Sequence, residues 1–587
     1  MAGDAGAKAL SPPPGLSVAR ASFWTSISPR GLLIVGLFLL VACLTLVPLV
    51  TVVVSSFRPD GLPLSPGWTA DHYTEVWSAA YTWRLLGNSL LFAGASAGLA
   101  LIIGLALAWL IERTDIPLPD LFRAAILMPM ATPPLLLAIG WALVMSPQIG
   151  LIPMTLKPLI GPLPKFLDIY SLGGAIFVQG LAYVPTCFLM LSPAIRAIDP
   201  AFEEAALMSC APRPRVFVAI TLPFLLPTLL SLATILVMVG MLAFDVPAVI
   251  GIPGNVELLS IEVFRLMTPS SGLPEYGAGA ALSSAVFVVM VVGLVVYRRV
   301  LRHADRFATV TGKSYRPARL ALGRWRALAA GFVSLYVLAA IVLPLAALLW
   351  TSVTPYLGGF DMALLPRASF KAYGEVLTSP RVWGAALNTL IIAVACSAAL
   401  IALAVAVAWV ILRSGLRAAA WLDVIAMIPT GVPPLMMSVA LIFIAFSIRS
   451  IPIYGTIWLI ALGHVIIYLP VACRMMQAGL VQINAELEQA AHVAGASHLQ
   501  ALRLILLPLL KPTVIAIVIW VAVHSIREFS IAVMLQSGRN TVVSTILYNF
   551  WQNGNAAQAA AIAVMMMIGL CVMVAISAMI TRRQQAT

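Results

Sequence analysis

Two polar, alanine-rich segments of the chain are copies of one another, and each places carboxylates at the start of a short helix. The copies are offset by 285 residues without a gap. Glu, Ala, Leu and Met are strong helix formers, and a polar stretch between apolar spans cannot face lipid. We therefore predict one docking or connecting helix per half of the chain. The matched residues are Glu203, Glu204, Ala205, Ala206, Cys210 and Ala211 in the first copy and Glu488, Gln489, Ala490, Ala491, Gly495 and Ala496 in the second.

The composition indicates an all-α integral membrane protein. The chain of 587 residues is 61% hydrophobic and 10% charged, with a mean hydropathy of +1.01. Uncharged runs such as 31–56 exceed the roughly 18 residues that span a bilayer as a helix. The pattern predicts twelve transmembrane helices, at 31–57, 85–111, 122–146, 173–194, 223–250, 279–297, 327–353, 385–412, 420–447, 456–476, 508–533 and 556–580.

The net charge of +13 orients the chain in the bilayer. The Lys and Arg residues gather in alternate loops and both tails, and positive residues favour the cytoplasm. We therefore expect both termini to be cytoplasmic. We also expect the positive charges to serve the lipid bilayer and not to bind nucleic acid. The six cysteines show neither metal-ligand spacing nor a disulfide framework.

The repeat extends beyond the two polar segments. Asn88 matches Asn388 at an offset of 300, as do two proline clusters. Six spans per half is an even number, so the halves are predicted to be parallel six-helix repeats about an axis along the membrane normal. The predicted regions are a cytoplasmic tail at 1–30, a first permease domain at 31–297, a basic cytoplasmic linker at 298–326, a second permease domain at 327–580 and a cytoplasmic tail at 581–587.

Polar groups within spans are costly and are candidates for a transport pathway. Asp245 and Glu528 lie late in the fifth span of each half, and Gln179 matches His464 midway in the fourth. These four residues could line a polar pathway. The alternatives are a structural pairing of Glu528 with Arg527, an interfacial Asp245, and hydrogen bonds between helices for Gln179 and His464. No cluster predicts a catalytic site or a metal site.

The two copied segments resemble the EAA motif, the cytoplasmic coupling loop of type I ABC importer permeases. Each follows the fourth span of its half and precedes a span that opens with proline, as in that family. The resemblance covers nearly the whole chain and implies two permease domains fused in one polypeptide. It further implies two ATPase subunits docked at the loops, a periplasmic solute-binding protein, and a multi-pass location in the bacterial inner membrane.

This chain is not expected to bind a cofactor itself. Gly312-Lys313-Ser314 is similar to the end of a phosphate-binding loop, but Phe307 stands where that loop needs glycine. ATP and Mg would therefore be bound by the partner ATPase, and this chain would be a transport subunit and not an enzyme. A secondary transporter would share the span count but would not need matched loops, and a membrane enzyme would need a catalytic cluster.

Finer resemblance points to the ferric-iron-type permeases. It rests on Glu112-Arg113-Thr114-Asp115, on Ser146 to Leu151 and on Thr311 to Pro317. The implied cargo is ferric iron, and related permeases carry aminoethylphosphonate, thiamine or other small solutes.

One position departs from the family pattern. The family's glycine is Gly495 in the second loop, where it can supply the left-handed residue that ends a helix. The first loop has Cys210 instead, and a side chain pays a steric cost in the left-handed region. We therefore expect the first loop to turn with a different geometry, so that the two loops would not dock symmetrically.

Overall fold

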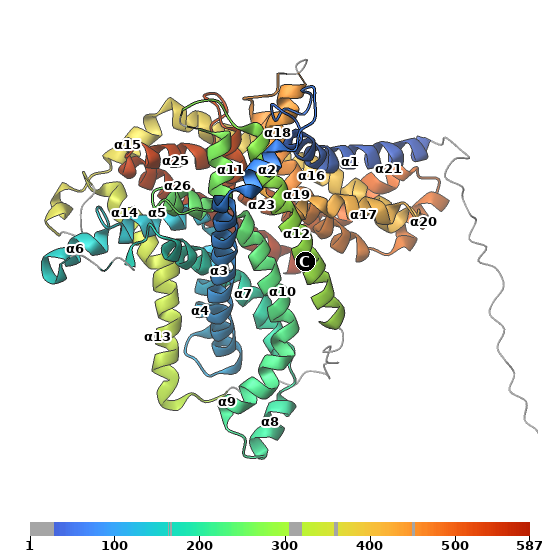
Figure 1. Ribbon diagram of the computed structural model, residues 1–587. Coiled ribbons are helices and arrows are strands. Elements are labelled where there is room, and N and C mark those ends of the chain that lie inside the picture. The colour runs from blue at the N-terminus through green and yellow to red at the C-terminus, as the bar shows by residue number, and fades with distance from the viewer. Residues whose placement is uncertain are drawn as a thin grey trace, which may run out of the picture.

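The computed structural model is built of helices throughout the residues that it describes, which are 29–161, 164, 167–269, 271–304, 320–356, 362–448, 452–586 (Figure 1). Residues 1–28 of the N-terminal tail predicted at 1–30, and residues 305–319 of the basic linker predicted at 298–326, lie outside the described residues. Within them, the one extended pairing is an isolated bridge between Thr114 and Leu320.

The first half contains the helices α1 to α12. Their bounds are α1 Pro29–Ser56, α2 Asp71–Ser78, α3 Ala80–Arg113, α4 Pro119–Leu127, α5 Pro134–Met145, α6 Leu151–Ile160, α7 Leu172–Ala197, α8 Pro200–Met208, α9 Arg213–Val216, α10 Leu222–Leu242, α11 Leu259–Met267 and α12 Tyr276–Ala304.

The second half repeats this order with the helices α13 to α26. Their bounds are α13 Arg326–Val337, α14 Leu343–Val353, α15 Lys371–Thr378, α16 Pro380–Arg413, α17 Ala419–Met427, α18 Pro434–Ser447, α19 Ile457–Val481, α20 Ala485–Val493, α21 His498–Ala501, α22 Leu507–Leu509, α23 Lys511–Arg527, α24 Ser530–Leu535, α25 Val543–Gln552 and α26 Ala556–Ala586.

The predicted spans are present, but several are not straight. Nine helices in the described residues are long and apolar enough to cross a membrane, and three bent pairs raise the number to twelve. Two of these pairs occupy the predicted spans 122–146 and 420–447, where the chain turns by 100° and 106°. Pro133 and Pro433 stand in extended conformation at the two turns, because proline cannot continue the preceding helix. The third pair joins 498–509 to 511–527 with a bend of 73°.

The fifth span of each half is also interrupted, at equivalent places. The spans predicted at 223–250 and 508–533 break where Ala243 and Glu528 adopt extended backbone. A broken helix at membrane depth is tolerated where protein surrounds the freed backbone groups. Short helical segments resume after each break, at Pro247–Gly251 and in α24.

The two halves interlock through their first spans. Helix α1 packs on α17 and α18 of the second half, and α13 and α14 pack on α4 and α5 of the first (Figure 1). Gly140 of α5 allows this approach, since a Cβ atom there would lie 2.6 Å from the Cβ atom of Pro344 in α14. Small residues commonly permit such close helix crossings in membranes.

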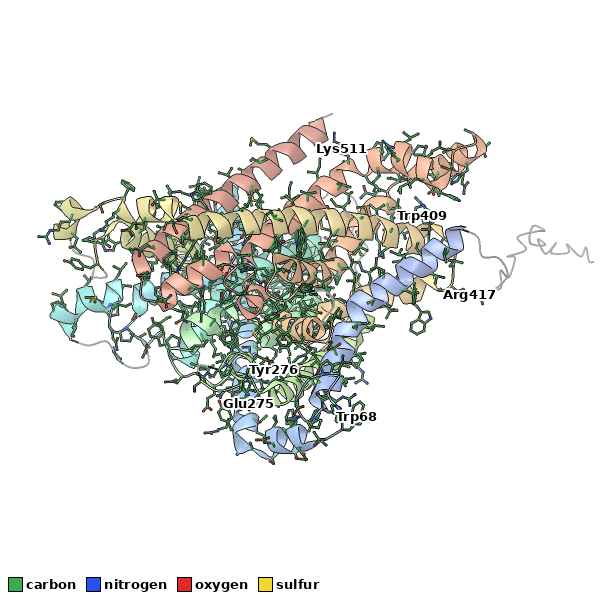
Figure 2. All side chains as sticks on the ribbon, turned by 90° about the horizontal axis from the view of Figure 1, so that it is seen from above. Trp68, Glu275, Tyr276, Trp409, Arg417 and Lys511 are labelled. Atoms are coloured by element: carbon green, nitrogen blue, oxygen red, sulfur yellow. The ribbon has the colours of Figure 1, made fainter. Side chains whose placement is uncertain are left out.

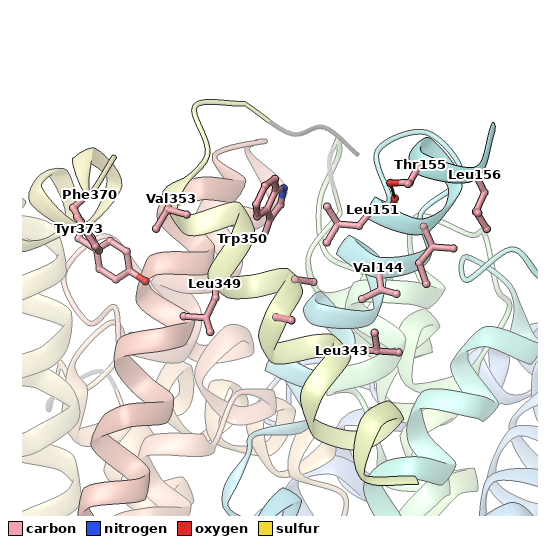
Figure 3. A pocket seen from close by; sticks show the side chains of 13 residues that line it. Val144, Leu151, Thr155, Leu156, Leu343, Leu349, Trp350, Val353, Phe370 and Tyr373 are labelled. Atoms are coloured by element: carbon pink, nitrogen blue, oxygen red, sulfur yellow. Dashed lines mark hydrogen bonds between the residues drawn. The ribbon is translucent and has the colours of Figure 1, made fainter. Parts of the chain in front are cut away.

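A groove of about 930 Å³ lies beside this crossing, between α5, α6 and α14 (Figure 3). Leu151, Leu349, Trp350 and Val353 line it with other largely apolar side chains. It offers no charged group to a hydrated solute. The groove therefore does not qualify as the transport site.

The crossing at Gly140 yields a stability prediction. Gly140→Ala places a methyl group against the backbone and side chain of Pro344, so it should destabilise the interlocked halves by about 1–3 kcal/mol. The thermal unfolding midpoint of the purified protein measures this. Gly94→Ala is the matched control, because Gly94 also lies within a helix and has open space around it. Equal midpoints for the two variants would contradict the predicted crossing constraint.

Candidate functional site

The two copied segments, named coupling loops after their predicted role, are helical hairpins at the ends of the fourth spans. The first consists of α8 and α9 and continues through a π-helical turn, Phe217–Thr221, into α10. The second consists of α20 and α21 and continues through the equivalent turn, Leu502–Leu506, toward α23. In Figure 1 the first loop lies at the bottom of the molecule and the second at its right edge.

An arginine at the end of the second span anchors the first loop. Arg113 donates hydrogen bonds to the backbone oxygens of Ile195 and Ile198, at 3.0 and 2.9 Å. Its guanidinium also lies 4.0 Å from the Glu203 carboxylate, which accepts a 2.7 Å hydrogen bond from Thr221. The loop carboxylate thus holds α8 to both flanking spans.

The second loop repeats this arrangement. Arg413 donates to the backbone oxygens of Leu480 and Ile483, at 3.3 and 2.5 Å. Its Nε atom lies 3.8 Å from Glu488 Oε2, and Trp409 Nε1 donates a 2.8 Å hydrogen bond to Glu488 Oε1. Glu488 is buried and stands in the first turn of α20, so its charge meets partners within this chain.

The outward face of each loop is apolar at matching positions. Met208 and Val493 are 87% and 90% exposed, and Phe202 and Leu487 are also exposed. Of the residues singled out from the sequence, Glu204, Ala205, Gln489 and Ala490 lie on this outer side, whereas Ala491 is buried and Ala206, Ala211 and Ala496 are half-buried. The sequence analysis missed the four apolar residues, although their shared offset of 285 could have revealed them.

The predicted difference between the two turns is wrong. Gly495 has a φ of +86°, and Cys210 has a φ of +59°. Each turn is closed by the same hydrogen bond, from Ala211 N to Ala206 O at 3.2 Å and from Ala496 N to Ala491 O at 2.9 Å. These 6→1 bonds are the Schellman motif. Cys210 therefore adopts the left-handed conformation despite its side chain, and the loops turn alike.

A second polar group lies where the fifth span of the second half breaks. Glu528 Oε2 lies 3.3 Å from His464 Nε2, and the same carboxylate accepts hydrogen bonds from the Ile531 and Ala532 amides, at 2.8 and 3.2 Å. It therefore caps the short helix α24. Glu528 and His464, two of the four pathway candidates, are thus in contact, and Glu528 also stabilises the start of a helix.

The breaks of the two halves meet at a pair of stacked rings. Phe244 and Phe529 have ring centroids 6.0 Å apart and planes inclined by 7°, and they are equivalent at the repeat offset. Asp245 follows Phe244, and its Oδ1 atom is buried without a hydrogen-bond partner. Arg527 precedes this region and donates to Met130 O, at 2.5 Å, in the first half.

Gln179 and Asp245 complete the pathway candidates. Gln179 is buried in α7, and its Oε1 atom has no hydrogen-bond partner among the described residues. At the repeat offset Asp245 aligns with Ser530 and not with Glu528. The Asp245 and Glu528 carboxylates are therefore not equivalent in the repeat. Asp245 follows its phenylalanine in the sequence, whereas Glu528 precedes its own.

The turn geometry predicts the effect of substitutions at its left-handed residue. Cys210→Gly should relieve a steric cost of about 1–2 kcal/mol, whereas Gly495→Ala should introduce a similar cost. Hydrogen exchange of the amides in 200–216 and 485–501 measures the two effects. Cys210→Ala serves as the control, since it keeps a Cβ atom and should leave exchange nearly unchanged. Faster exchange after Cys210→Gly would contradict the shared geometry.

The arginine anchor gives a second prediction. Arg413→Gln leaves two helix-end carbonyls without their charged donor and Glu488 without the nearby positive charge, at a cost of about 1.5–3 kcal/mol. Amide exchange in α20 should accelerate. Arg417→Gln is the control, because Arg417 is exposed and lies toward the same side of the molecule as Trp409 (Figure 2). Similar exchange in both variants would show that the anchor does not hold α20.

Comparisons with known proteins agree with this architecture. A family model described as "Binding-protein-dependent transport system inner membrane component" matches residues 90–308 and 398–585. The ferric transport system permease protein FbpB of Actinobacillus pleuropneumoniae is 24% identical over 531 residues, which cover 89% of this chain and 74% of that protein.

Other matches cover less than half of the chain. The putative 2-aminoethylphosphonate transport system permease protein PhnV of Salmonella typhi is 25% identical over 241 residues, or 41% of this chain and 90% of that protein. A crystal structure of a bacterial alginate ABC transporter with its alginate-bound periplasmic protein covers 42% of this chain and 85% of the matched chain, at 18% identity and a TM-score of 0.32. On the family match, which takes in most of its length in two segments, the chain belongs to the inner-membrane components of binding-protein-dependent transport systems, with the permease domain present twice.

Proposed function

We propose that this chain is the complete membrane pathway of an ATP-driven importer, with two separate ATPase subunits docked on its coupling loops. The apolar outer faces of α8 and α20 would enter a groove on each ATPase. A solute-binding protein would deliver cargo at the opposite side of the membrane. Both termini would then be cytoplasmic, on the side of the loops.

The observation that carries this proposal is the continuity between each loop and the stacked rings. The first loop runs through a π-helical turn into α10, which ends at the break beside Phe244. The second runs through the matching turn to α23, which ends beside Phe529. A force applied at the first loop would therefore reach the contact between the halves along α10, and a force applied at the second loop would reach it through α22, the bend of 73° and α23.

The anchors make such a force transmissible. Arg113 and Arg413 tie each loop to the ends of the second and fourth spans, so the loop cannot move without those spans. Closure of two ATPases on ATP would move both loops together and separate Phe244 from Phe529. The pathway would then open alternately to the two sides of the membrane.

Ferric iron is the cargo that we propose. Ferric transport permeases match most of this chain, and the carboxylates of Asp245 and Glu528 flank the contact between the halves. Oxygen donors suit a hard cation. 2-Aminoethylphosphonate is the alternative, because permeases named for it match one half and because Arg527 lies beside the same contact.

Reconstitution tests both the mechanism and the cargo. The chain alone in proteoliposomes should hydrolyse no ATP, and adding its ATPase and binding protein should start uptake of labelled ferric iron but not of 2-aminoethylphosphonate. Asp245→Asn should lower iron uptake severalfold, because it removes a charge at the contact between the halves. The exposed surface pair of Asp120 with Arg123 contributes little, so Asp120→Asn is the control. ATP hydrolysis by the chain alone would refute the importer, and preferred phosphonate uptake would refute iron as cargo.

A further inference from the structure

Three side chains of metal-binding type converge inside the second coupling loop. One ligand atom from each of Glu488, His492 and His498 lies within 4.8 Å of the other two. Glu488 and His492 are four residues apart on α20 and therefore share a face of the helix. The left-handed turn at Gly495 folds α21 back, so that the rings of His498 and His492 lie 4.3 Å apart between centroids.

The hydrogen bonds of His492 prepare it as a ligand. Its Nδ1 atom lies 2.9 Å from the backbone oxygen of Ala496, which can only accept a hydrogen bond. Nδ1 therefore carries the proton, and the Nε2 lone pair faces Glu488 Oε1 at 4.0 Å. Metal-binding histidines are commonly oriented in this way, by donation from the other ring nitrogen to a carbonyl.

Glu488 is also held in place by its surroundings. Its side chain is 9% exposed, Trp409 fixes Oε1 through a 2.8 Å hydrogen bond, and Oε2 is buried without a hydrogen-bond partner. Arg413 approaches from the Oε2 side, so a cation would lie on the Oε1 side, between the carboxylate and the imidazoles.

The donor set selects the class of ion. Two imidazole nitrogens and one carboxylate oxygen suit Zn²⁺, Fe²⁺ and similar divalent transition metals, whereas Ca²⁺ and Mg²⁺ prefer oxygen donors. The first loop keeps the glutamate as Glu203 but has Leu207 and Arg213 at the positions of the two histidines. The metal-binding side chains therefore belong to one loop and are not a requirement of the shared hairpin.

We propose that Glu488, His492 and His498 bind one divalent transition-metal ion that fastens α20 to α21. Bound metal would stiffen one coupling loop and leave the other unchanged. On the importer function proposed above, cytoplasmic metal would then adjust how one of the two ATPases engages.

Metal binding can be measured on the full chain in lipid nanodiscs, without any partner. Titration with Co²⁺, followed by its visible absorption, should show one ion per chain that Zn²⁺ displaces. His498→Gln and His492→Gln should each weaken the affinity on the order of tenfold or more. His72→Gln is the control, because that imidazole lies in an outer segment against the Arg58 carbonyl. Absence of bound Co²⁺, or equal affinity in all variants, would overturn the site.

A separate measurement tests whether bound metal stabilises the packing of α20 against α21. Zn²⁺ should slow amide exchange in 485–501 of the parent protein but not of His498→Gln, and each protein is compared with and without the metal so that any effect of the substitution itself cancels. Unchanged exchange in metal-loaded parent protein would overturn the fastening. These measurements need no ATPase or solute, so their failure would leave the importer proposal standing, and failure of reconstituted transport would leave the metal site standing.

Discussion

One arginine at the end of the second span in each half holds a loop hairpin to the spans around it. The last carbonyls of a helix have no partner within it, and Arg113 and Arg413 supply donors to these carbonyls on the fourth span. The same guanidinium groups face the loop glutamates. In each half, a single planar cation therefore closes a helix end, orients the loop hairpin and joins three segments of the repeat.

The contact between the halves depends on interrupted helices. Proline ends the third span's first segment in each half, and extended residues end the main helix of the fifth. Each interruption exposes backbone groups that neighbouring side chains must satisfy, as Glu528 does for α24. Stacked phenylalanines at equivalent positions then make the two halves meet through the same residue of each repeat.

Much of this arrangement is readable from the sequence because repetition and hydropathy are local properties. The twelve apolar runs, the two loops and the left-handed Gly495 all follow from such signals. The bends at Pro133 and Pro433 were not predicted, because hydropathy alone defined the spans, although the repeated proline clusters could have revealed them. The inward orientation of Glu488 depends on Arg413, from a distant span. The conformation of Cys210 was predicted wrongly, because the prediction considered only the steric cost of a side chain in the left-handed region. The hydrogen bond that closes the turn favours that conformation in the folded loop. The approach of His498 to His492 requires the folded turn itself.

The crossed first spans have a consequence for biosynthesis. Helix α1 packs against α17 and α18, which follow it by more than three hundred residues. Helix α12 of the same half also packs on α1 and is made earlier. At a synthesis rate of about 5–20 residues per second, roughly 20–70 seconds pass before α17 and α18 emerge. Lipid must solvate it during this interval, and its composition permits that, because it is apolar around its whole circumference with a mean hydropathy of 2.9. The packing of the first span is thus completed only after helices from the second half of the chain have been made.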